Sequence, residues 1–179
     1  MYIEDGKGKG YLANVTDENK LRVYSTVESE LSFESETNER TYTWSNVSYN
    51  YTAGDTVLLL KNTDNSKNLI IDGIQLSGDT ETKVVLHCPE CTTPTGTAVT
   101  GVNWNRTSSL TADANSKANE STNTQANIIG IFRIDGNNSS FVPMDGGLVL
   151  GLNDCIAIDF MTDGGEANVS VRGYYHTKK

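Results

Sequence analysis

The residues best suited to chemistry in this chain are one histidine and two cysteines in the short run His87–Cys91 (His-Cys-Pro-Glu-Cys). This run has the spacing of one half of a zinc knuckle. A structural zinc site needs four ligands, which two such knuckles usually supply, and the remaining candidates Cys155 and His176 lack knuckle spacing. The strand-to-helix context of a thioredoxin-like redox centre is also absent. We therefore expect no metal site, and either reduced thiols or a disulfide within this loop.

Other catalytic groups are equally hard to assemble from the sequence. His87 and His176 are the only two histidines, and no Gly-x-Ser-x-Gly nucleophile elbow accompanies them. Most carboxylates fall in predicted turns and solvated edges, so no glycosidase pair can be recognised. Only Asp72 and Asp159 stand out inside apolar strands, and we expect each to point outward from its sheet. The sequence therefore predicts no catalytic residues, no cofactor and no enzymatic activity.

Charge and hydropathy argue against two further classes of protein. The 179 residues include 14 Lys and Arg against 23 Asp and Glu, for a net charge of -9. Nucleic-acid binding needs a basic surface, so we expect no nucleic-acid partner. No apolar run approaches the ~20 residues of a membrane span, so we expect no membrane partner. The start Met1–Gly6 lacks the basic and apolar regions of a secretory signal, which predicts synthesis in a cytoplasm.

Short apolar runs separated by turn residues predict an all-β fold. Abundant Asn, Ser and Thr disfavour helices and suit turns and solvated strand faces. We expect no helix of any length, and the acidic segment 28–40 is predicted to be an edge strand or a loop. Gly73, inside an apolar run, suggests a bulge or a close approach. The clearest predicted strands are Thr56–Asn62, Asn68–Leu76, Thr82–His87, Ile128–Ile134, Leu148–Leu152, Cys155–Met161 and Val169–Tyr175.

These strands predict one domain, a single antiparallel β-sandwich of jelly-roll type. Residues 1–18 contain the Gly-Lys repeat Gly6–Gly10 and are expected to form an extended N-terminal arm. The sandwich domain is expected to span 19–179. A long polar loop is predicted at about 105–127, because Leu110 is its only large apolar residue. A loop of this length is usually functional, and we expect it to pack on a neighbouring subunit.

The segment Arg40–Tyr51 gathers aromatic side chains on a predicted strand. Alternation puts Tyr42 and Trp44 on one face, with Val47, Tyr49 and Tyr51 on the other. Such residues usually fill a sandwich core or a subunit interface. Exposed aromatic residues on a β-sandwich also suit stacking on sugar rings, so both readings stay open.

Three segments of the chain together resemble a family of small virion proteins of tailed bacteriophages, especially marine ones. The first is Ile3–Val23, with its Gly-Lys repeat. The second is Val102–Ser109 (Val-Asn-Trp-Asn-Arg-Thr-Ser-Ser), followed by an Ala-Asp-Ala stretch. The third is Gly147–Asp154, followed by a strand, a glycine turn and the run Val169–Tyr175. These motifs are structural and include no catalytic residue.

The resemblance implies a homotrimeric decoration or cement protein on the capsid surface of a virion, made in the host bacterial cytoplasm. Its partner would be the major capsid protein, bound between subunits. The residues expected to contact the capsid or a sister subunit are Ile3, Tyr11, Leu12, Trp104, Arg106 and Leu110. The alternative is a host-attachment or carbohydrate-binding module, such as a head fibre or receptor-binding tip, with Trp44 or Trp104 stacking on a glycan.

Overall fold

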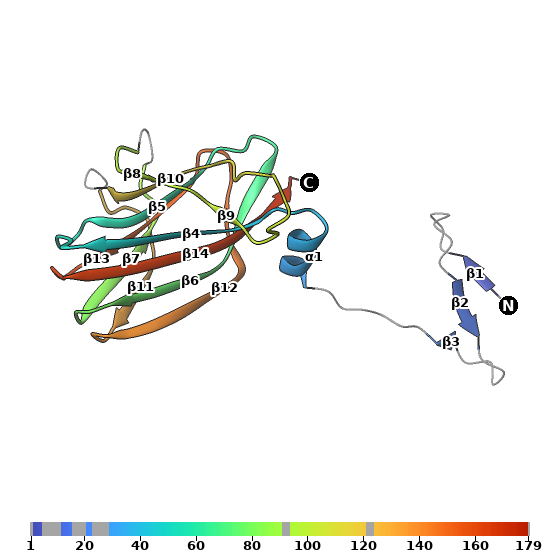
Figure 1. Cartoon of the computed structure of the whole chain (residues 1–179), viewed down its shortest axis with the longest axis horizontal. Coiled ribbons are helices and arrows are strands. Elements are labelled where there is room, and N and C mark those ends of the chain that lie inside the picture. The colour runs from blue at the N-terminus through green and yellow to red at the C-terminus, as the bar shows by residue number, and fades with distance from the viewer. Residues whose placement is uncertain are drawn as a thin grey trace.

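The computed structural model describes residues 2–4, 12–15, 21–22, 29–90, 94–120 and 124–178. Most of these residues lie in strands, and two antiparallel sheets stack as a β-sandwich (Figure 1). The predicted all-β antiparallel sandwich is therefore confirmed. A small third sheet contains β1 (Tyr2–Glu4), β2 (Leu12–Val15) and β3 (Leu21–Arg22). These strands pair with one another and with neither large sheet.

The first large sheet has six strands in the order β11-β7-β13-β5-β10-β8. Their bounds are β5 (Thr56–Asn62), β7 (Thr82–His87), β8 (Thr97–Val99), β10 (Ala114–Glu120), β11 (Ile128–Ile134) and β13 (Cys155–Phe160). The second has five strands in the order β12-β6-β14-β4-β9. Their bounds are β4 (Thr41–Tyr49), β6 (Lys67–Gly78), β9 (Val102–Asn103), β12 (Asn138–Leu150) and β14 (Glu166–Thr177).

The core lies between the two sheets and is built from alternate residues of each strand. Tyr42 and Trp44 of β4 are buried in it, while Val47 and Tyr49 face solvent. The predicted split of these side chains between two faces is confirmed, except that Tyr51 is also buried because it lies beyond the end of β4. Since Trp44 has no exposed surface, the expectation that it could stack on a glycan is wrong.

Two register irregularities change which side chains share a face. Val57 of β5 has no partner in β13, where the pairing shifts between Ile158 and Asp159. Because Val57 and Leu58 both enter the core, Thr56 turns to the outer face of the six-stranded sheet. A similar shift leaves Asp72 of β6 unpaired beside Gly73. The bulge predicted at Gly73 is confirmed.

One short helix, α1 (Glu30–Glu36), lies where a strand or loop was expected, and this prediction is wrong. The side chain of Ser29 caps the helix by accepting a hydrogen bond from the backbone N–H of Ser32. Glu34 is buried, and its Oε1 atom lies 3.5 Å from Nδ1 of His176 in β14. The helix thus packs at the end of the sandwich where the C-terminus lies (Figure 1). Capping and tertiary contact stabilise a helix that its polar composition disfavours.

The polar segment predicted as one loop at about 105–127 is interrupted by β10, so this prediction is corrected. β10 pairs with β5 on one side and β8 on the other. Its inward residues Ser116 and Ala118 are small, and Glu120 accepts hydrogen bonds from Thr95 and Gly96. Small or hydrogen-bonded side chains allow a strand to be buried without an apolar sequence pattern.

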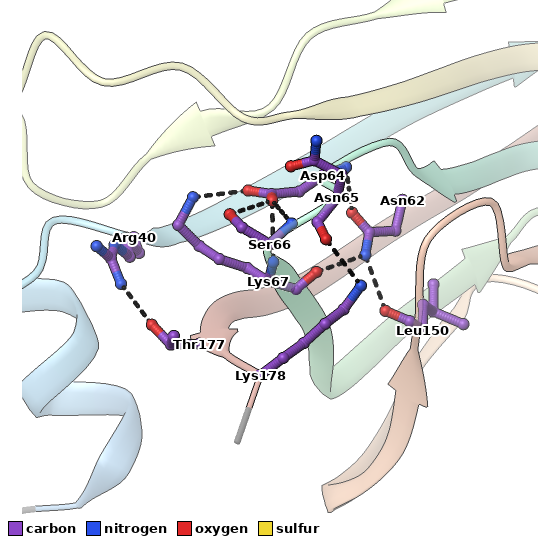
Figure 2. Close-up of polar contacts among 9 residues, drawn as sticks. All are labelled: Arg40, Asn62, Asp64, Asn65, Ser66, Lys67, Leu150, Thr177 and Lys178. Atoms are coloured by element: carbon purple, nitrogen blue, oxygen red, sulfur yellow. Dashed lines mark hydrogen bonds and ion pairs between the residues drawn. The ribbon is translucent and has the colours of Figure 1, made fainter.

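The β5–β6 turn is closed by a compact set of hydrogen bonds around Asp64 (Figure 2). Its carboxylate accepts from Ser66 and from the backbone N–H of Lys67, and it lies 2.7 Å from Lys67 Nζ. Asn62, fully buried, donates to the carbonyl oxygens of Lys67 and Leu150. The turn therefore joins β6 to the end of β12.

Candidate functional site

A histidine and a carboxylate meet in the buried part of the molecule, on the outer face of the six-stranded sheet. His87 Nε2 lies 2.9 Å from Asp159 Oδ2, and both side chains are fully buried. Asp159 also accepts hydrogen bonds from Thr56 Oγ1 at 2.7 Å and Gln125 Nε2 at 3.0 Å. Asp159 points outward from its sheet as expected, but this outer face is itself covered, so the carboxylate is buried. The apolar strands β5, β7 and β13 are covered on this face too.

This buried pair is arranged for structure and leaves no atom for a substrate. The backbone N–H of Ala126 points at His87 Nδ1 at 3.4 Å, so Nδ1 is the acceptor and Nε2 carries the proton toward Asp159. Every polar atom of the pair thus faces a protein group. The network holds the segment around Gln125 against the sheet.

The cysteines next to His87 do not form the expected loop disulfide. Cys88 is free and half-buried, and burial raises the pKa of its thiol, with the charge of Asp154 adding to the rise. Cys155 is disulfide-bonded, a pairing that the sequence did not predict. Its partner lies outside the described residues. The raised pKa of Cys88 opposes formation of the thiolate that redox chemistry or metal binding would need.

The outer face of the five-stranded sheet carries a group of side chains that we call the aromatic row: Trp104, Arg172 and Phe141. The Cζ atom of Arg172 lies 5.3 Å from the ring centre of Trp104 and 5.5 Å from that of Phe141. Both rings are exposed, Trp104 to 42% and Phe141 to 53%. Arg172 also forms an ion pair with Asp72, which lies at the bulge of β6.

Strand register explains why these distant residues meet. Val102 of β9 pairs with Thr43 of β4, Thr43 pairs with Arg172 of β14, and Arg172 pairs with Gly73 of β6. Gly73 in turn pairs with Pro143 of β12, two residues from Phe141. The aromatic row therefore crosses the whole sheet, from the edge at β9 to the edge at β12.

A second exposed feature is the isoleucine edge, made of Ile128, Ile129 and Ile131 on β11. Strand β11 is the last strand of the six-stranded sheet, and each of these three side chains is about half exposed. A groove of about 340 Å³ lies beside Ile131 and Phe132. An apolar edge strand with unpaired backbone groups is a template for association with another chain.

The other three edges of the two sheets are protected against such association. Strands β8 and β9 have only three and two residues. Strand β12 is long but contains Pro143 and a register shift between Pro143 and Leu148. Short strands, prolines and bulges are the usual means of blocking edge pairing. Of these protective features, β11 has a single register shift near Ile129 and neither a proline nor a short length.

The structure places the predicted contact residues in two separate groups. Ile3 in β1 and Leu12 in β2 belong to the small N-terminal sheet, where Glu4 pairs with Leu12 and Ile3 with Ala13. Tyr11 lies outside the described residues. The other three, Trp104, Arg106 and Leu110, are exposed on the segment that follows β9.

Sequence reasoning singled out Trp104 but missed the residues that surround it. Phe141 and Arg172 lie on strands far along the chain, and only the strand order brings them to Trp104. The isoleucine edge was also missed, because the run Ile128–Ile134 has the composition of a buried strand. An alternation of polar and apolar residues would have indicated an exposed face, and this run does not have one.

The residues that the structure describes include no group of three or more His, Cys, Asp or Glu side chains placed to hold a metal ion. Within the same ranges, no helix is both long and apolar enough to cross a membrane. The described part of the chain is thus an antiparallel β-sandwich that exposes the aromatic row on one sheet and the isoleucine edge on the other. Comparison with known proteins found no matching family model, no matching curated protein and no matching solved structure.

Proposed function

We propose that this protein is a structural component of a tailed-phage virion that decorates the capsid as a homotrimer. The observation that carries this proposal is the isoleucine edge. Three half-exposed isoleucines on one edge strand, beside three protected edges, support association with a protein partner. Burying these side chains against a partner would stabilise the complex by about 2–4 kcal/mol per subunit. In this proposal the edge joins sister subunits.

The capsid contact is assigned to the N-terminal arm and to the exposed segment after β9. Strands of two to four residues in a three-stranded sheet are too short to be stable alone, so β1, β2 and β3 gain from a partner surface. Arg106 and Leu110 are exposed on the segment after β9. We place the major capsid protein against these two groups.

We also infer a jelly-roll topology for the sandwich. The order β4-β14-β6-β12 in one sheet and β5-β13-β7-β11 in the other supports it. Along these eight strands the chain alternates between the two sheets except from β7 to β11, which are neighbours in the six-stranded sheet. This path is that of two Greek keys. Strands β8, β9 and β10 then form an insertion between β7 and β11. Such sandwiches are common in capsid proteins.

The proposal is tested by the solution mass and by binding to shells. Light scattering should give three times the 19.5 kDa mass of the chain, with or without reductant. The purified protein should co-sediment with empty shells assembled from the major capsid protein of the same genome. Ile131→Lys places a charge on the isoleucine edge and should yield monomers at concentrations where the wild type is a trimer.

The matched control is Val47→Lys, on the outer face of the other sheet, where the side chain is 45% exposed. Its mass should equal that of the wild type. A wild-type monomer at every concentration would contradict the trimer. If both substitutions lowered the solution mass equally, the isoleucine edge would not be the subunit contact. Failure to co-sediment would contradict capsid decoration itself.

A further inference from the structure

The aromatic row has the properties of a prepared binding surface. Trp104 Nε1 donates a hydrogen bond of 2.7 Å to Thr43 Oγ1, which fixes the orientation of the indole. Phe141 packs over Gly73, where an added Cβ would lie 2.4 Å from the ring. Arg172 then fills the space between the two rings. Because both rings are held before any ligand arrives, little conformational entropy is lost on binding.

The sheet surface on one side of the row, toward the start of β14, is rich in hydroxyl and amide groups. These groups come from the three central strands β4, β14 and β6 and alternate with core residues, so they share the outer face. They are Thr43, Ser45, Gln75, Ser77, Asn168 and Ser170. Ser45 and Ser170 lie 2.8 Å apart, oxygen to oxygen. Such groups can donate and accept hydrogen bonds with the hydroxyls of a sugar.

The charge of the row and of the whole chain favours a neutral ligand. The ion pair between Arg172 and Asp72 leaves the row with no net local charge. The whole chain carries a net charge of -9, so a polyanionic ligand is repelled at long range. A neutral ligand is therefore favoured over an acidic polysaccharide or a nucleic acid.

We propose that the aromatic row binds a neutral polysaccharide, with pyranose rings packed on Trp104 and Phe141 and hydroxyl groups bonded to the adjacent polar side chains. The apolar C–H face of a pyranose packs well on an aromatic ring. Because the row crosses five strands spaced about 4.8 Å apart, it is long enough for several successive sugar units. The row shares no residue with the isoleucine edge or the arm, and only Trp104 lies on the segment assigned to the capsid, so the site adds a function to the proposed capsid role.

A protein partner fits the row less well than a saccharide does. The centre of a protein interface is depleted in charged residues and continuous in its apolar surface. Here an ion pair separates two single rings, and the polar surroundings are small side chains. The isoleucine edge has the opposite character, because its three apolar side chains lie within four residues of one strand with no charged residue between them.

The test is native gel electrophoresis of the full chain through gels that contain one soluble neutral polysaccharide each. The probes are hydroxyethyl cellulose, laminarin, yeast mannan and a galactomannan. At least one should retard the wild type, and free oligosaccharides of that polymer should quench the fluorescence of the exposed Trp104. Trp104→Ala and Phe141→Ala should each weaken binding about tenfold, whereas Trp104→Phe should retain most of it because a ring remains.

The control variant is Tyr49→Ala, which removes an aromatic side chain of the same outer face that is 68% exposed but lies off the row. It should migrate as the wild type does, and melting curves should show that every variant is folded. No retardation by any of the four polymers would overturn the proposal. Gels with the acidic polymers alginate and dextran sulfate are run as controls, and retardation by these alone would also overturn it. So would equal losses in Tyr49→Ala and Trp104→Ala.

Shell binding distinguishes this proposal from the capsid role. Phe141→Ala should co-sediment with shells as well as the wild type does, because Phe141 of β12 lies on none of the surfaces assigned to the capsid. If Phe141→Ala abolishes co-sedimentation, the row is a protein contact and the saccharide assignment fails. If no polymer binds but the protein still co-sediments with shells, the capsid role is retained and the saccharide proposal is rejected.

Discussion

At the scale of single residues, Asp159 shows how a buried carboxylate can be structural. Its three donors come from His87, Thr56 and Gln125. Asp159→Asn would turn an NH₂ group toward one of these donors and leave buried groups unsatisfied. We expect a loss of about 1–3 kcal/mol in the free energy of unfolding, measured by urea denaturation. Asp135→Asn, in an exposed turn, should change it by less than about 0.5 kcal/mol.

Asp64 gives a prediction about acid stability. Burial alone would raise the pKa of Asp64, but hydrogen bonds from Lys67 and Ser66 outweigh it and hold the pKa well below its usual range. Because the pKa is lower in the folded state, the contribution of Asp64 is present above the unfolded value of about 3.9 and is lost as pH falls below it. Asp64→Asn should therefore cost about 1–3 kcal/mol at pH 7.

That difference between wild type and Asp64→Asn should shrink steadily when urea denaturation is repeated between pH 4 and pH 2. The variant keeps a side chain of the same shape, so a constant difference would mean that packing, and not the charge, stabilises the turn in Figure 2. Asp55→Asn, half-exposed in another turn, is the matched control.

At the scale of elements, Gly73 links β6 to β12 through the ring of Phe141. A Cβ at this position would meet the ring at 2.4 Å, so Gly73→Ala must displace Phe141. We expect the variant to lose about 1–3 kcal/mol in the free energy of unfolding and to bind polysaccharide as weakly as Phe141→Ala. Thr52→Ala, at an exposed position between β4 and β5 and away from the row, should leave both quantities unchanged within about 0.5 kcal/mol.

The elements also show what a single sequence can predict. The runs Thr56–Asn62, Thr82–His87 and Ile128–Ile134 match β5, β7 and β11, because apolar strands bounded by turn residues leave a clear pattern. β10 and α1 were missed since their burial depends on hydrogen bonds to distant segments, and not on hydrophobicity. The same limit applies to the aromatic row, where strand order joins Trp104 to partners that no local spacing identifies.

At the scale of the whole molecule, the two exposed surfaces lie on different parts of the sandwich. The isoleucine edge belongs to the last strand of the six-stranded sheet, while the aromatic row crosses the outer face of the five-stranded sheet. A sister subunit can therefore cover β11 without covering the row. This separation predicts that Ile131→Lys monomers still bind polysaccharide at each site, with lower avidity than the trimer because fewer sites are linked.

The N-terminal arm gives the last prediction. Strands β1, β2 and β3 pair with neither large sheet, so removing residues 1–12 takes no hydrogen-bond partner from the described sandwich. We expect the truncated protein to keep its melting temperature, its trimeric mass and its polysaccharide binding, and to lose co-sedimentation with shells. Replacing Gly6, Gly8 and Gly10 by Ser, which keeps the length of the arm, is the control and should preserve shell binding. Full occupancy of shells by the truncated protein would show that the arm is not the capsid contact, and would move that role to the exposed segment around Arg106 and Leu110.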